Sequence, residues 1–101
     1  MKTDEIMAGL PGEELVRQGL ADFQAGRQTV PACLVRIAHP RLSRAGLMPV
    51  EVPNAASDAE LELYGLLKLE GGDAYSRYNS LLRELVSFEN ALDGRLRRIR
   101  N

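Results

Sequence analysis

Cys33 and His39 are the residues of this sequence whose side chains most often serve metal sites and nucleophilic catalysis. The chain has no other cysteine or histidine, and a structural zinc site needs three or four protein ligands. Cys33 falls among the apolar residues of a predicted helix, which favours a buried thiol over a reactive one. His39 has an ordinary pKa near neutrality, but no serine elbow or glycine-rich phosphate loop accompanies it. The sequence therefore predicts no catalytic residue, no metal site and no cofactor.

Arginine is the residue type best suited to bind a partner in this chain. Its planar guanidinium group makes bidentate contacts with carboxylates and phosphates. Residues 95–100 hold four arginines and no acid, and residues 27–50 hold another four, again without an acid. These arginines and the neighbouring histidine form a candidate interaction surface, consisting of Arg36, His39, Arg41, Arg44, Arg95, Arg97, Arg98 and Arg100.

Two kinds of partner suit such a surface, an acidic protein or a nucleic acid. Nucleic-acid-binding domains are normally clearly basic, whereas this chain has a net charge of −1 and a pI near 5.8. A helix-turn-helix over residues 13–38 would place an apolar second helix in the groove, with few side chains able to contact base edges. Nucleic acid is therefore the less favoured partner. A bias toward arginine can also reflect genome composition rather than function.

Length and composition indicate one ordinary globular domain over residues 1–101, with a modest core. The opening residues Met1–Glu5 carry acids where a secretory signal has a basic start and an apolar run. No stretch approaches the roughly 18 apolar residues of a membrane span. A single cysteine cannot form an internal disulfide, which fits a reducing compartment. We therefore expect a cytoplasmic protein with no membrane contact.

Helix-start and helix-stop residues divide the first half of the chain. Pro11, Glu13 and Glu14 predict a helix over residues 13–25 that ends at Gly26. Thr29 is a suitable N-cap for a second helix, and Pro40 predicts a break at residue 39 with one further turn through residue 44. Residues 1–10 are expected to be loosely ordered or to form one turn, and residues 47–56 to be irregular.

Gly19 lies in the middle of the apolar face of the first predicted helix. A glycine inside a helix costs about 0.5–1 kcal/mol relative to alanine. A close approach by the backbone of another helix would compensate for this cost. The position therefore predicts a tight helix–helix contact.

The second half of the chain predicts two longer helices. A capping box over residues 57–60 starts a helix that extends to Glu70, and Gly71 and Gly72 end it. Asp73 caps a final helix that runs to about residue 93 and is followed by a basic tail at residues 94–101. The final helix has a heptad-like apolar stripe, formed by Ala74, Tyr78, Leu81, Leu85, Phe88 and Leu92.

These elements predict an all-α fold, a small bundle of about four helices arranged as two antiparallel hairpins. The helix over residues 58–70 is apolar nearly all round, and the final helix has an apolar flank beside its stripe. Dimerisation would cover this surplus, so a candidate self-association face comprises Leu63, Leu66, Leu69, Tyr75, Leu82 and Val86. The predicted function is a non-catalytic helical interaction or accessory module that binds a second copy or another protein. The alternative is a small regulatory protein that docks on nucleic acid or an acidic partner through its arginines.

Overall fold

The computed structural model describes residues 3–51 and 58–100, and the regular structure within these ranges is entirely helical. The predicted all-α class is confirmed. Six helices follow one another along the chain: α1 (Thr3–Met7), α2 (Glu13–Gln24), α3 (Val30–Ile37), α4 (His39–Arg44), α5 (Ala59–Glu70) and α6 (Ala74–Arg100). The number exceeds the predicted four because α1 and α4 are short additional helices.

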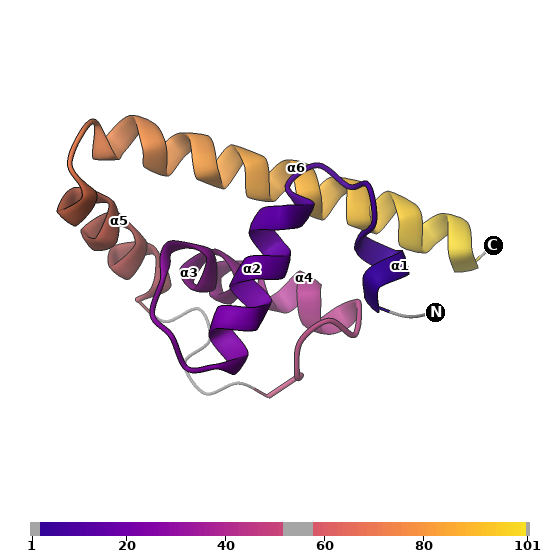
Figure 1. Ribbon diagram of the computed structural model, residues 1–101. Helices are drawn as coiled ribbons and strands as arrows, with labels where there is room; N and C mark the ends of the chain where they lie inside the picture. Colours follow the sequence, from indigo (N-terminus) through magenta and orange to yellow (C-terminus); the bar gives the residue numbers. More distant parts are fainter. Residues whose placement is uncertain (1–2, 52–57, 101) are drawn as a thin grey trace.

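The long helix α6 forms one edge of the molecule, and the other helices lie along one side of it (Figure 1). The overall dimensions are 45 × 26 × 18 Å, so the molecule is elongated. Leu85, Phe88 and Leu92 from the predicted stripe are buried in the common core. The apolar stripe of α6 thus packs as its spacing predicted.

The prediction that this last helix ends near residue 93 is wrong, since α6 continues through Gly94 to Arg100. A glycine weakens a helix interior by about 1 kcal/mol. Tertiary contacts on both sides of Gly94 outweigh this cost: Leu92 is buried, Leu96 packs against the core, and Arg95 binds α1. The basic segment is therefore the final part of a packed helix.

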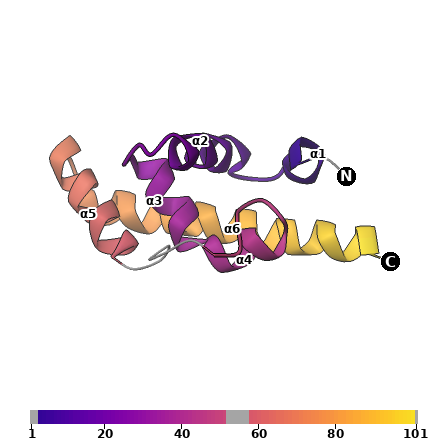
Figure 2. The ribbon, with the colours of Figure 1, turned by 90° about the horizontal axis from the view of Figure 1, so that it is seen from below.

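The N-terminal segment packs against the C-terminal end of α6 (Figure 1 and Figure 2). Residues 3–7 form the single helical turn α1, and Met7 and Leu10 are buried in the core. The beginning and the end of the described chain therefore lie close together.

The predicted helix boundaries agree with local hydrogen bonds at several positions. Thr29 accepts a hydrogen bond from the backbone of Ala32 at 3.2 Å, and Asp73 accepts one from the backbone of Ser76 at 3.0 Å. The break predicted before Pro40 separates α3 from α4. Ser57 of the predicted capping box lies outside the described residues, as do residues 52–56 of the predicted irregular segment.

The close helix contact predicted at Gly19 is confirmed between α2 and α3. A Cβ atom added at this position would lie 2.3 Å from the carbonyl oxygen of Pro31 and 2.6 Å from a methyl group of Val35. Only glycine allows the two helices to approach so closely. Cys33, two residues before Val35, is buried in α3, as its apolar surroundings predicted.

Helix α5 is enclosed on one side only. Ala59, Leu63 and Leu67 are buried, whereas Leu61 and Leu69 on the opposite side are 74% and 85% exposed. An apolar surface on all sides of a helix predicts enclosure by neighbours, and here the rest of the chain encloses half of it. This outer side of α5 is an unusual place for two leucines.

Candidate functional site

Arg36 connects α3 to α5. Its Nη1 donates to Glu62 Oε2, and the same carboxylate oxygen lies 4.0 Å from the Cys33 Sγ atom. Burial raises the pKa of the Cys33 thiol, and the negative charge of Glu62 raises it further. The thiol therefore stays protonated at neutral pH, which makes it a poor nucleophile.

His39 also makes a contact within the chain. Its Nε2 lies 2.8 Å from the backbone carbonyl oxygen of Pro49. Because a carbonyl oxygen can only accept, Nε2 carries the proton in this contact. The ring links the start of α4 to the segment that follows it.

Three of the candidate arginines share one cavity. Arg41 and Arg44 from α4 and Arg97 from α6 line a cavity of about 360 Å³, together with Asp93 and Leu96. Arg41 is already paired with α6, through Nη1 to Asp93 Oδ2 at 2.7 Å and Nε to a carboxylate oxygen of Glu89 at 3.6 Å. Burial raises the pKa of Glu89, and the positive charge of Arg41 opposes this shift. The cavity is therefore a partly neutralised basic site.

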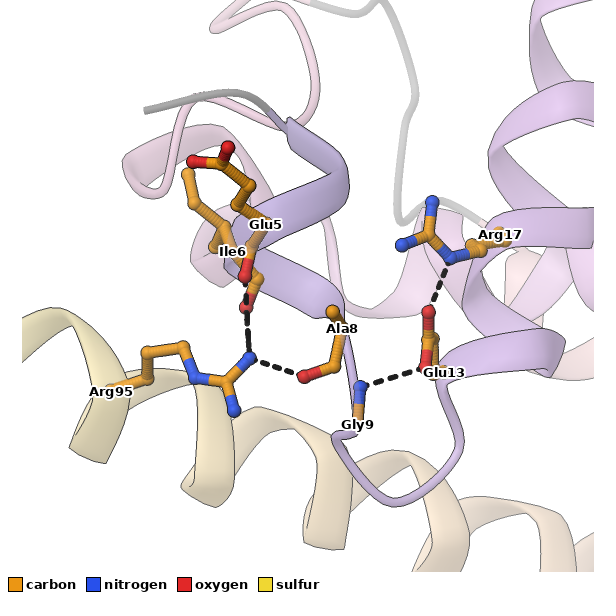
Figure 3. A network of polar contacts seen from close by, with 7 residues as sticks. All are labelled: Glu5, Ile6, Ala8, Gly9, Glu13, Arg17 and Arg95. Carbon is orange, nitrogen blue, oxygen red and sulfur yellow. Dashed lines mark hydrogen bonds and ion pairs between the residues drawn. The ribbon is translucent and has the colours of Figure 1, made fainter.

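Arg95 faces another part of the molecule and binds the C-terminal end of α1 (Figure 3). Its Nη1 donates to the carbonyl oxygens of Glu5, Ile6 and Ala8 at 3.4, 3.1 and 2.5 Å. The last carbonyl groups of a helix lack partners within the helix and carry partial negative charge. Arg95 is therefore a cap for α1 contributed by α6.

Glu13 extends this polar network toward α2 (Figure 3). Its carboxylate accepts from the backbone N–H of Gly9 at 2.9 Å and from Arg17 Nε at 2.6 Å. These two hydrogen bonds, the one from Gly9 first, lower the pKa of Glu13. The network orders the turn between α1 and α2.

The predicted arginine surface is thus divided among several places. Arg98 lines a separate cavity of about 310 Å³ with Glu5, Arg95 and Ile99. The Arg100 side chain lies outside the described part of the structure. Among the described residues, Arg41, Arg44 and Arg97 form the largest group of candidate arginines that shares one cavity, and Arg95 and Arg98 share another.

The candidate self-association face is divided as well, and Leu63 does not belong to it. Leu63 is fully buried because it points to the side of α5 that packs on the core. Leu69, with Leu66 and Gly65, lines a cavity of about 380 Å³ on α5. The other members lie on α6, where Tyr75, Leu82 and Val86 line one groove.

The α6 groove has a volume of about 750 Å³, and all the described residues that line it belong to α6. Tyr75 is 67% and Val86 51% exposed. Asn79 and Arg83 also line the groove and were not among the predicted site residues, although Asn79 lies seven residues and Arg83 three residues before Val86. Leu61, on the outer side of α5, was missed because a helix that is apolar all round gives no preferred face.

Within residues 3–51 and 58–100, no three Cys, His, Asp or Glu side chains come close enough together to hold a metal ion. None of the described helices combines the length and apolarity needed to cross a bilayer. Comparisons with protein-family models, curated proteins and solved structures found no match to this chain.

Proposed function

We propose that this protein is a non-catalytic helical interaction module that associates with a second copy of itself through α5 and α6. The observation that carries the proposal is the position of its exposed large apolar side chains. Five large apolar side chains of the described residues are more than half exposed, and four of them lie on these two helices, Leu61 and Leu69 on α5 and Tyr75 and Val86 on α6. The fifth, Val50, lies outside both helices. Exposed apolar surface that gathers on neighbouring elements is typical of protein interaction sites. Burying it contributes roughly 25 cal/mol per Å².

The absence of catalysis is proposed from the contacts of the two most reactive residues. Cys33 is buried with a raised pKa, and the His39 ring is bound to a backbone carbonyl. Neither side chain is among those lining the cavities described above.

Docking on nucleic acid or on an acidic partner through arginines has less support. Arg36, Arg41 and Arg95 are engaged with acceptors of their own chain. A phosphate or carboxylate ligand would have to compete with those contacts. The proposed self-association does not require any of these contacts within the chain to break.

Sedimentation velocity over low micromolar to submillimolar concentrations tests the proposal. The weight-average mass should rise with concentration, and replacing both Leu69→Gln and Val86→Gln should reduce that rise. Val50→Gln is the matched control, because Val50 is 76% exposed but lies outside α5 and α6. A wild-type protein that remains a monomer throughout the range would contradict the proposal.

A further inference from the structure

We infer that two copies of the chain pair in parallel along α6, with Tyr75, Asn79, Leu82 and Val86 forming the seam between the helices. This inference rests on the proposed self-association and adds the geometry of the part formed by α6. The four residues follow one another at steps of four, three and four, and they line one groove. That spacing is the heptad repeat of a coiled coil, with Asn79 and Val86 at a positions and Tyr75 and Leu82 at d positions.

The residue types at these positions favour a parallel pair. A β-branched residue at a with leucine at d favours two strands, and an asparagine at one a position specifies the register. Val86, Leu82 and Asn79 match these preferences in turn. Asn79 Nδ2 donates to the Tyr75 carbonyl oxygen at 3.1 Å, which leaves its side-chain oxygen able to accept from a second Asn79.

The neighbouring elements limit the length of this pairing. Toward the C-terminus the seam would continue through Glu89 and Asp93, and Arg41 from α4 already binds both. On one edge of the seam, at the g positions, Leu85 is buried and Tyr78 partly buried in the chain's own core. In a parallel pair the twofold axis runs between the helices, so the two cores lie on opposite sides and do not collide.

Charge complementarity supports the same register. Arg83 occupies an e position, which in a parallel pair faces the g position five residues earlier on the second helix, here Tyr78. The Tyr78 hydroxyl lies 3.4 Å from Glu60 Oε2, so a carboxylate stands beside this position. Within the described ranges Arg83 has no ion-pair partner in its own chain. Pairing therefore brings Arg83 of each copy to Glu60 of the other.

The size of the seam sets the strength of the association. Four seam residues within twelve positions bury less surface than the roughly 1,200 Å² of a standard stable interface. We therefore expect a weak dimer, with a dissociation constant on the order of 100 μM.

Charge exchange tests the register. Arg83→Glu and Glu60→Arg should each weaken dimerisation roughly tenfold, because each replaces two symmetry-related attractions with repulsions. The double variant Arg83→Glu/Glu60→Arg should restore it, as measured by sedimentation equilibrium at constant ionic strength. Arg98→Glu is the control, since it makes the same charge change elsewhere on α6. Equal dimerisation of all variants would overturn the register while leaving self-association intact, and a monomeric wild type would overturn both.

Cross-linking tests the parallel direction independently. In parallel pairing at this register, positions 79 and 86 of one helix each meet the same position of the other, whereas an antiparallel pair can bring at most one of them to its counterpart. Asn79→Cys and Val86→Cys should therefore each give a disulfide-linked dimer under mild oxidation, whereas Ser87→Cys, exposed beside the seam, should give little. Cross-linking of only one of the two seam variants, or equal cross-linking of all three, would overturn the inference.

Discussion

Gly19 shows how a single hydrogen atom in place of a side chain determines a helix contact. Gly19→Ala should lower the free energy of unfolding by about 1–3 kcal/mol, the usual cost of overpacking, because the added methyl group would overlap the Pro31 carbonyl. Urea denaturation measures the effect. Gly65→Ala is the matched control, since nothing lies within 4 Å of its added Cβ, and it should stabilise by about 0.5–1 kcal/mol. Equal effects of the two substitutions would show that α2 and α3 can separate at no cost.

Asp22 is the buried acid that holds the turn between α2 and α3. Its carboxylate accepts from Thr29 Oγ1 at 2.7 Å and from Arg27 Nε and Gln18 Nε2, each at 2.9 Å. The hydrogen bond from Thr29 is the largest cause of its lowered pKa, ahead of those from Arg27 and Gln18.

A lowered pKa in the folded state makes the stabilisation by Asp22 dependent on pH. The contribution is complete above the unfolded-state pKa of about 3.9 and is lost as the pH falls through the lower folded-state pKa. Asp22→Asn should therefore destabilise the protein at neutral pH, with the difference from wild type shrinking as the pH falls below about 4. Denaturation midpoints across this range provide the measurement, with the exposed Glu14→Gln as control. A difference that is constant with pH would contradict this account.

At the scale of elements, α1 depends on a contact from α6. A five-residue helix is too short to be stable by itself in water. Arg95→Ala removes its cap, and we expect amide hydrogen exchange at residues 6–10 to accelerate roughly tenfold while the middle of α6 stays protected. Arg98→Ala, three residues further along the same helix, serves as the control. Unchanged exchange in the Arg95 variant would show that the burial of Met7 and Leu10 is sufficient.

The elements that sequence patterns predicted well are those controlled by neighbouring residues. The Thr29 and Asp73 caps, the break at Pro40 and the buried stripe of α6 depend on spacings of a few residues. The continuation of α6 beyond Gly94 depends instead on packing against α1, and no local spacing reports that contact.

The candidate site was harder to predict for the same physical reason. The arginines were identified as a group, but their acceptors come from distant segments, as in the contact of Arg95 with Ile6 and of Arg36 with Glu62. Periodicity could not assign the exposed side of α5, because leucines occur on nearly every side of it. Only the packed structure distinguishes the buried Leu63 from the exposed Leu61.

At the scale of the whole molecule, α6 contributes to both the buried core and an exposed apolar surface. Its stripe organises the core, and its exposed flank, the α6 groove, lies beside that stripe rather than opposite to it. Helix α4 covers the C-terminal part of this flank through Arg41. The proposed second copy would cover the N-terminal part, so that one helix is buried along its length partly by its own chain and partly by another.

The cap that Arg95 provides for α1 also orders events during protein synthesis. The ribosome makes the α1 carbonyls 87 to 90 residues before the guanidinium that binds them. Closing so long a loop costs more chain entropy than forming the local helix pairs. Helix α1 is therefore translated before α6 but completed after it, and it stays uncapped until the final turns of α6 have emerged.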